Sequence, residues 1–184
     1  MKIKVLVLTL ALSTVFLAGC GSKETKAPAP APTKAATDVV ASASLVDNAA
    51  AFQKAISKDG TWIIATLKDI TIDKDLVLEG EFKNGKKDAA GKDAIQRKIG
   101  LYTQDDKRVV TARFNLTAPK ITIKSPEASI EHGTFKGDVY VSVKNFKLID
   151  AKVDGNMYFT SEEAQSTFKK DATSSVTGKS ELKK

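Results

Sequence analysis

The sequence predicts an all-β domain of the β-solenoid type, and two observations lead to this prediction. When the sequence is shifted against itself by one 18-residue unit, three segments superimpose, namely 117–123, 135–141 and 153–159. Within each unit, apolar and polar residues alternate twice, which is the two-residue period of half-buried strands. Such a unit is too short for a propeller blade or a helical repeat, and it matches one coil of a β-solenoid.

The repeat predicts rows of apolar side chains that stack inside the coils about 4.8 Å apart. We expect three such rows: Ile121, Val139 and Met157; Ile123, Val141 and Phe159; and Val110, Ala128 and Phe146. The same template fits once more near the start of the domain. There it predicts that the following side chains face inward: Ala65, Leu67, Ile72, Leu76 and Leu78. Because this first unit is separated from the second by much more than one repeat, we interpret residues 79–109 as an insertion. The sequence leaves open whether the insertion is a hairpin or an irregular extra coil.

A short amphipathic helix is expected before the first coil. Its apolar face carries Leu45, Ala49, Phe52 and Ile56, and Gly60 ends it. A helix lying on a membrane is the alternative, but this segment lacks the length and the cationic face that such a helix favours. We therefore expect the helix to dock on the free edge of the first coil.

A second helix is expected after the last coil. Residues 160–163, Thr-Ser-Glu-Glu, form a capping box, and the helix is predicted to run to about Lys170. Ala164 and Phe168 lie on one side of it, from where they would cover Met157 and Phe159. A solenoid has an unpaired strand edge at each end, so the two helices are predicted to act as caps.

The N-terminal segment, residues 1–19, differs from the rest of the chain. It holds Lys2 and Lys4, no acidic residue, and an apolar run too short for a membrane-spanning helix, which needs roughly 20 apolar residues. The run ends in Leu-Ala-Gly-Cys at residues 17–20 and resembles the lipobox signal of bacterial lipoproteins. The resemblance implies that Cys20 receives a diacylglycerol on its thiol and that the chain is cut just before it. The alternative is an ordinary secretory signal with an incidental cysteine.

Residues 20–44 are expected to be a lipid-anchored tether. They contain an Ala-Pro-Ala-Pro-Ala-Pro run and three of the five prolines, and they offer almost nothing to bury. Such a run favours extended polyproline II, so the spacer would hold residues 45–184, the predicted solenoid domain, up to roughly 70 Å from a membrane. The expected location is the cell membrane or envelope surface, after export.

The amino-acid composition narrows the chemistry. The chain has 184 residues, which is enough for one domain, and a net charge of +7. It contains one cysteine and one histidine, too few for a disulfide framework or for a metal cluster with thiolate or imidazole ligands. We therefore expect no metal and no cofactor.

Part of the repeat resembles a known family. The segments Gly-Asp-Val-Tyr-Val, at 137–141, and Gly-Asn-Met-Tyr-Phe, at 155–159, resemble the bactofilin-type solenoids, over residues 110–159. The whole domain is similar to uncharacterised solenoid lipoproteins of bacterial envelopes. The bactofilin likeness implies end-to-end polymers, but the lipobox, the insertion and the expected caps depart from that pattern. We therefore expect a monomer or a small oligomer, and the resemblance carries over no catalytic residue.

Few residues favour catalysis. His132 and Asp150 share a register one coil apart, which places them within hydrogen-bonding reach, but a histidine–aspartate contact alone lacks a nucleophile. Asp138 and Asn156 follow turn glycines, where short polar side chains serve the backbone.

A polysaccharide-processing enzyme would need two acids, but Glu131 aligns with Ile149 and Arg113, so no ladder of carboxylates appears on that face. A two-acid site would have to draw on Asp150, Asp154 or the insertion. Catalysis is thus the less favoured alternative.

Two surface features favour binding. Tyr140 and Tyr158 align on the outward side of their strand, in one row with Thr122 and Val77. Residues 83–108 hold eight basic and four acidic side chains, and the basic residues proposed as a ligand surface are Lys86, Lys87, Arg97 and Lys98. Natural partners would be the membrane, through the anchor, and an anionic wall polymer or glycan. Nucleic acid is not expected, because no recognition motif accompanies the charge.

These observations predict a lipid-anchored surface lipoprotein that acts as a structural or ligand-binding module. A polysaccharide-processing β-helix enzyme and a self-assembling envelope scaffold are the alternatives.

Overall fold

The computed structural model describes residues 43–183, which consist mainly of β-strands with two short α-helices. The predicted all-β class is confirmed. The elements are β1 (Ala43–Val46), α2 (Ala49–Ile56), β2 (Ile63–Thr66), β3 (Ile70–Thr71), β4 (Leu76–Leu78), β5 (Lys83–Lys87), β6 (Asp93–Ile95), β7 (Arg97–Gly100), β8 (Tyr102–Gln104), β9 (Val110–Arg113), β10 (Asn115–Ile123), β11 (Ala128–Glu131), β12 (Thr134–Val141), β13 (Lys147–Ile149), β14 (Lys152–Asp154), β15 (Met157–Phe159), α3 (Glu162–Ser166), β16 (Lys169–Lys170), β17 (Ser175–Val176) and β18 (Ser180–Leu182).

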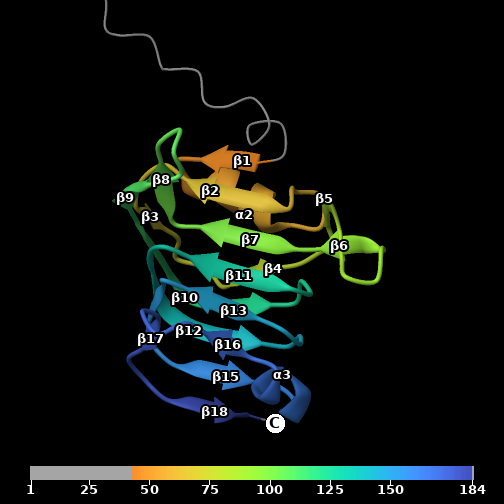
Figure 1. The fold of residues 1–184 in the computed structure, drawn as a ribbon. Helices are drawn as coiled ribbons and strands as arrows, with labels where there is room; N and C mark the ends of the chain where they lie inside the picture. The colour runs from red at the N-terminus through yellow and green to blue at the C-terminus, as the bar shows by residue number, and fades with distance from the viewer. Residues whose placement is uncertain (1–42, 184) are drawn as a thin grey trace, which may run out of the picture. The chain divides into compact units, whose positions relative to one another are not determined.

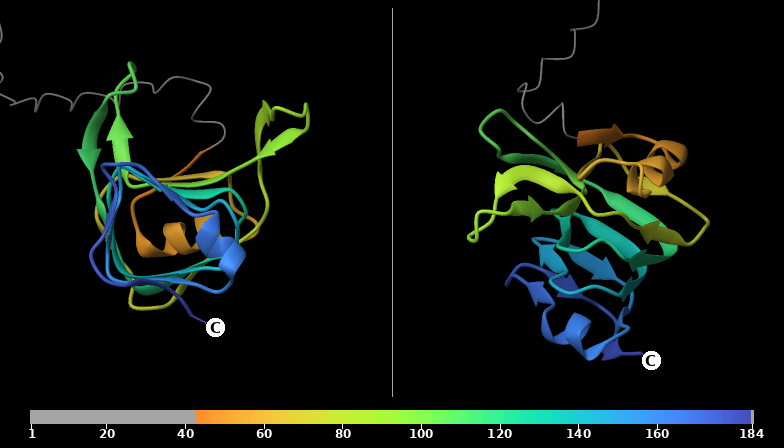
Figure 2. Two further views of the ribbon diagram at one scale, coloured as in Figure 1. Left: turned by 60° about the horizontal axis from the view of Figure 1, so that its bottom comes forward. Right: turned by 90° about the vertical axis from the view of Figure 1, so that its right-hand side faces the viewer.

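Most strands belong to two parallel sheets. One sheet has the order β1-β2-β7-β11-β13-β16. In the other, the long strand β10 pairs with β3, β4 and β12, and β12 pairs with β14 and β15, which pair in turn with β17 and β18. The chain passes back and forth between these sheets, giving one or two strands to each sheet at every pass, and the two antiparallel hairpins, β5–β6 and β8–β9, project from the stack (Figures 1 and 2).

Two of the predicted apolar rows are confirmed. Ile121 pairs with Val139 and Val139 with Met157, while Ile123, Val141 and Phe159 pair in the same way. All six side chains are at most 1% exposed. Full burial of such a side chain stabilises the fold by about 1.5–3 kcal/mol, so these rows form a large part of the core. Leu76 and Leu78 extend both rows by one strand, as predicted.

The third predicted row is only partly correct. Ala128 and Phe146 are buried, but Val110 lies in the β8–β9 hairpin opposite Gln104. The place beside Ala128 is taken by Arg97 of β7. The prediction failed because β7, which lies inside the predicted insertion, is itself a strand of the six-stranded sheet. The segment 79–109 therefore contains the hairpin β5–β6, the sheet strand β7, and the strand β8 of the second hairpin.

The inward register predicted for β2 is wrong by one residue. Ile64 and Thr66 are buried, whereas Ala65 is only partly buried and Leu67 is 44% exposed. Ile64 pairs with Ile99, and the Thr66 hydroxyl donates to the Gly100 carbonyl at 3.4 Å. That hydrogen bond satisfies the hydroxyl group, so a threonine is tolerated inside.

The first helix, α2, begins later than predicted. Leu45 lies in β1, which pairs with β2, and is 53% exposed. Asn48 is the N-cap, since its side chain accepts a hydrogen bond from the Ala51 N–H at 2.9 Å. Phe52 and Ile56 are buried as expected, and α2 contacts β1, β2 and β4.

The second helix, α3, is shorter than predicted. Ser161 caps it, by accepting from the Ala164 N–H, and it ends at Ser166 instead of near Lys170. Phe168 lies beyond the helix and packs on the rings of Phe146 and Phe159, with centroids 6.0 and 5.4 Å away. Strands β16, β17 and β18 then continue both sheets, so they, and not only α3, cover the strands of the preceding repeat.

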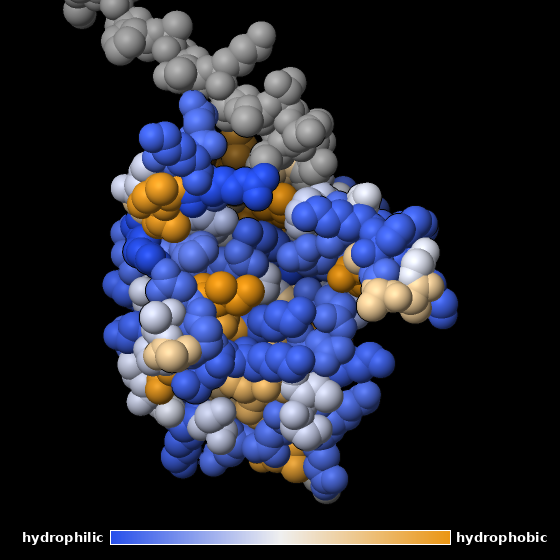
Figure 3. Space-filling view, in the orientation of Figure 1, coloured by the Kyte–Doolittle hydropathy of each residue, from blue (hydrophilic) through white to orange (hydrophobic). Residues whose placement is uncertain are grey.

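The face seen in Figure 1 is mostly hydrophilic, with smaller apolar areas between the charged side chains (Figure 3).

Candidate functional site

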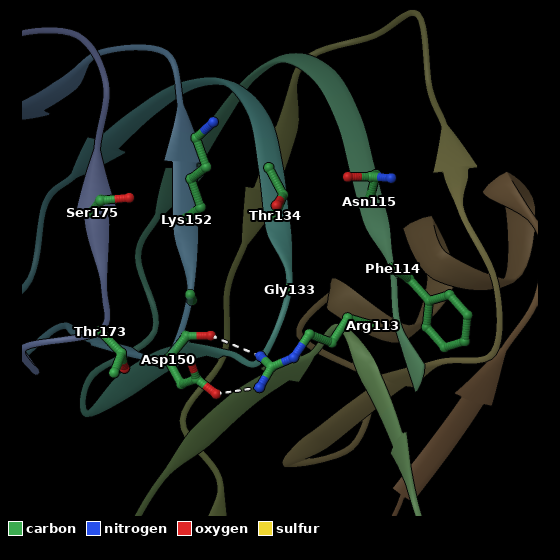
Figure 4. A pocket seen from close by; sticks show the side chains of 10 residues that line it. Arg113, Phe114, Asn115, Gly133, Thr134, Asp150, Lys152, Thr173 and Ser175 are labelled. Carbon is green, nitrogen blue, oxygen red and sulfur yellow. Dashed lines mark hydrogen bonds and ion pairs between the residues drawn. The ribbon is translucent and has the colours of Figure 1, made fainter. Parts of the chain in front are cut away.

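An open groove of about 390 Å³ crosses the outward side of β10, β12, β14 and β17 (Figure 4). Four polar side chains stand in one row along it, because Asn115 pairs with Thr134, Thr134 with Lys152, and Lys152 with Ser175. Neighbouring strands lie about 4.8 Å apart, so the row is roughly 14 Å long. The groove thus offers one polar side chain on each of four successive strands.

Small residues let the strands beside the groove approach one another closely. Gly133 and Ala151 are among its lining residues, and a Cβ atom at Gly133 would lie 2.4 Å from the Leu101 Cβ and 2.5 Å from the Phe114 carbonyl oxygen. A larger residue at 133 would therefore push the neighbouring strand away. The ring of Phe114, which is half-buried, stands at one end of the row (Figure 4).

An ion network lies beside the row. Arg113 donates to the Asp150 carboxylate at 2.5 Å and to the Asp150 carbonyl at 3.2 Å. His132 Nδ1 lies 3.0 Å from the same carboxylate, so the predicted contact between His132 and Asp150 is confirmed. Hydrogen bonds from Arg113 and then from His132 lower the pKa of Asp150, which keeps this carboxylate ionised at neutral pH.

Two left-handed backbone positions hold this contact in place. His132 and Asp150 have φ values of +60° and +48°, and they lie one repeat apart. Glu127 and Asn145 show the same pattern at the other corner, also one repeat apart, with φ values of +51° and +59°. Asn, Asp and His tolerate this conformation better than most residues, and the chain turns sharply at the same two places in both of these units.

A second carboxylate stands next to Asp150. Asp171 accepts hydrogen bonds from Ser174, and further ones from the Asp150 N–H and from Thr173, which hold its pKa at about 2. Glycoside hydrolysis by two acids needs one carboxyl group with a raised pKa that stays protonated. Both carboxyl groups here are shifted the other way, so this pair does not supply a general acid.

The predicted tyrosine row is confirmed. Tyr140 pairs with Tyr158, with ring centroids 4.9 Å apart, and Thr122 and Val77 continue the row on β10 and β4. Asp138 stabilises the backbone, as predicted, because its carboxylate accepts a hydrogen bond from the Asn156 N–H at 2.9 Å.

The predicted basic surface is smaller than expected. Lys86 and Lys87 are exposed on the β5–β6 hairpin, and Lys87 is paired with Asp93 at 2.5 Å. Arg97 is not on the surface at all, since it is 0% exposed. Lys98 is mostly buried: its side chain is 19% exposed and its ammonium lies 2.5 Å from Glu131. Desolvation lowers the pKa of Lys98, but the charge and the hydrogen bond of Glu131, together with Tyr102, outweigh it, so the net shift is upward.

Arg97 is buried because its guanidinium donates hydrogen bonds to backbone carbonyls at the end of α2. Its Nη2 donates to the carbonyls of Ala55 and Ser57, at 2.7 and 3.0 Å, and its guanidinium lies 3.8 Å from the ring centroid of Phe82. Burial lowers its pKa to about 10, which still leaves it charged at neutral pH. Arg97 therefore ties α2 to β7 and cannot contact an external ligand.

Sequence reasoning missed the groove row. Thr134 and Lys152 follow the 18-residue period, but the interval from Asn115 to Thr134 is one position longer, and the interval from Lys152 to Ser175 is longer still. An irregularity in β10 between Thr117 and Lys120 causes the first shift, and α3 causes the second. The recurrence of Thr134 and Lys152 was the one available signal.

Cys20, the predicted lipidation residue, lies outside the described residues. Within residues 43–183, no helix is long and apolar enough to cross a membrane. No family model, no curated protein and no solved structure matches the chain.

Proposed function

We propose that this chain is an exported, lipid-anchored β-solenoid that binds a polar polymer of the cell envelope, of the glycan class, on its outward face. The observation that carries the proposal is the groove with one polar side chain on each of four successive strands. A binding site that repeats from strand to strand suits a ligand that itself repeats. The solenoid is supported by the parallel pairing of residues about one repeat apart and by the repeated passage of the chain between two sheets.

The chemistry of the groove favours a polymer with many hydroxyl groups. Thr134 and Ser175 offer both hydrogen-bond donors and acceptors, and Phe114 offers an apolar ring face. Asn115 adds its amide group, although one of its N–H groups already donates to the Asp69 carboxylate at 2.8 Å. The charges nearly balance, because Arg113 is bound to Asp150 and Lys152 lies 3.6 Å from Asp154. A neutral or weakly charged glycan fits this balance better than a strongly anionic polymer does.

The test is glycan binding by the full chain, measured on a glycan array and then by calorimetry with the best ligand. Asn115→Leu and Thr134→Val each remove a hydrogen-bonding group, and each should weaken binding about two- to tenfold, as expected for about 0.5–1.5 kcal/mol per hydrogen bond. Thr122→Val is the matched control, because Thr122 is outward on the same sheet but lies in the tyrosine row.

Equal affinities of Thr134→Val and Thr122→Val would exclude the groove as the site. Binding that is lost at moderate salt would indicate an anionic polymer instead of a neutral glycan.

The lipid anchor has its own test. Cys20 is the only cysteine of the chain, so Cys20→Ser should abolish incorporation of labelled fatty acid and leave uncut precursor. Continued labelling of this variant would disprove the anchor without affecting the groove.

A further inference from the structure

The tyrosine pair on the outward side of β12 and β15 already holds a cation. Tyr140 and Tyr158 are half-buried, and their rings are tilted by 42°. Lys183, just after β18, places its ammonium 4.4 Å from the ring centroid of Tyr158 and 5.4 Å from that of Tyr140. The same ammonium donates to the Tyr140 hydroxyl at 3.2 Å.

The rings are the main partners of this ammonium. Within residues 43–183, Lys183 has no carboxylate at ion-pair distance, whereas Lys120, which lies 5.6 Å from the Tyr140 centroid, is paired with Asp75 at 3.0 Å. The hydrogen bond to Tyr140 raises the pKa of Lys183, and the charge of Asp138 adds to this effect. The surface around the rings therefore favours a positive charge.

We propose that the Tyr140–Tyr158 pair is a binding site for a quaternary ammonium group, and that Lys183 is a built-in competitor which the ligand displaces. Aromatic faces attract cations, and quaternary ammonium groups are the ligands that aromatic sites typically recognise. A primary ammonium such as that of Lys183 is compact and strongly hydrated, so it loses more hydration on contact with a ring. Lys183 is exposed and follows the last strand, so it can leave without disturbing a packed core.

This site is separate from the glycan groove. The groove row contains Thr134, the first residue of β12, and its partner Lys152 on β14. The tyrosine row contains Tyr140, near the C-terminal end of β12, with Thr122 and Tyr158 on the neighbouring strands. Failure of either proposal therefore leaves the other one standing.

The test is a titration of the full chain with tetramethylammonium chloride, followed by the chemical shifts of the tyrosine rings. Sodium chloride at equal ionic strength is the salt control. Lys183→Gln should bind about two- to fivefold more tightly, the factor that corresponds to the roughly 0.5–1 kcal/mol of an exposed cation–π contact. Lys136→Gln, which changes an exposed lysine of β12 away from the rings, is the matched control and should bind like the unchanged chain.

Two tyrosine variants distinguish the contribution of the aromatic ring to binding from that of the hydroxyl group. Tyr158→Leu should abolish binding, whereas Tyr140→Phe should keep it, because the ring face remains. Equal thermal midpoints of these variants would show that the fold is intact. The proposal is overturned if Lys183→Gln and Lys136→Gln bind equally, or if sodium chloride causes the same shifts.

The source of the ammonium group is distinguished with the full chain carrying Cys20→Ser. Binding of free choline, without preference for phosphatidylcholine over phosphatidylglycerol vesicles, would assign a soluble ligand. Preference for phosphatidylcholine vesicles that is lost in Tyr158→Leu would assign a lipid headgroup. Binding of neither choline nor phosphatidylcholine would overturn the proposal.

Discussion

Replacing Val139 with aspartate tests the central apolar row. Val139 is 0% exposed and lies between Ile121 and Met157 on the neighbouring strands. Loss of the valine burial costs about 1.5–3 kcal/mol. A carboxyl group buried without a partner has its pKa raised by up to about 3–5 units. At pH 7 it therefore stays protonated in the folded chain, which costs about 1.4 kcal/mol for each of the roughly 3 units above its unfolded pKa of about 3.9, or about 4 kcal/mol. The sum approaches the whole stability of a typical domain, about 5–15 kcal/mol.

The loss should depend on pH in a defined direction. The buried aspartate has a higher pKa in the folded chain than its unfolded value of about 3.9. The variant is therefore least destabilised below about pH 4, and it loses stability as the pH rises through the raised pKa. At low pH, only the cost of the lost apolar burial and of a buried neutral carboxyl group remains.

The assay is urea unfolding followed by circular dichroism at pH 4 and pH 7. Val77→Asp is the matched control, since it makes the same chemical change in β4, at an outward position of the tyrosine row. Val77 is 36% exposed, so its substitution should cost no more than about 1 kcal/mol, the span of strand propensities. If both variants lose the same free energy of unfolding, or if the loss in Val139→Asp relative to the unchanged chain is larger at pH 4 than at pH 7, the inward register is refuted.

Three further predictions concern the ends of the fold. Arg97→Met leaves the Ala55 carbonyl without the donor that Arg97 supplies, and it leaves the Ser57 carbonyl with the Gly60 N–H alone, so amide hydrogen exchange should become faster in α2 but not in β12. Unchanged protection of α2 would contradict this role of Arg97. Deletion of residues 160–184 removes β16–β18 and uncovers the edges of β13, β14 and β15. Light scattering should then reveal concentration-dependent aggregates, whereas a stable monomer would disprove the covering role of these strands. The pKa of Asp171 is about 2 in the folded chain, so the stability that it contributes is present above pH 4 and is lost as the pH falls towards 2. Across this range, the thermal midpoint of Asp171→Asn should fall less steeply than that of the unchanged chain. Parallel curves for the two proteins would exclude the effect.

The interior of the repeat was predictable because its signal is local and recurs. Alternation with a period of two residues decides which side chains face inward, and the constant spacing of the repeat aligns them between strands. Val139 and Val141 were thus assigned correctly, together with their partners on β10 and β15. The contact between His132 and Asp150 followed from the same spacing.

The first unit was less predictable because its pattern is ambiguous. Residues 63–67 read Ile-Ile-Ala-Thr-Leu, so either alternate set contains apolar residues. Pairing with Ile99 of β7 decides that Ile64 points inward, and the hydrogen bond of Thr66 makes a polar residue acceptable there. The helix boundary failed for a related reason, because Leu45 suits a helix face and a strand equally well, and pairing with β2 selects the strand.

The sequence by itself determined the all-β class, the inward rows of the repeat, the alignment of Tyr140 with Tyr158 and the contact of His132 with Asp150, because each depends on a short pattern that returns at a constant interval. Only the tertiary structure decided that Arg97 is buried. A charged residue can be buried when distant carbonyls, here those of Ala55 and Ser57, accept its hydrogen bonds. The groove row and the position of Lys183 over the tyrosines also came from the folded chain. They join residues separated by irregular intervals, and strand pairing, not sequence spacing, brings such residues together.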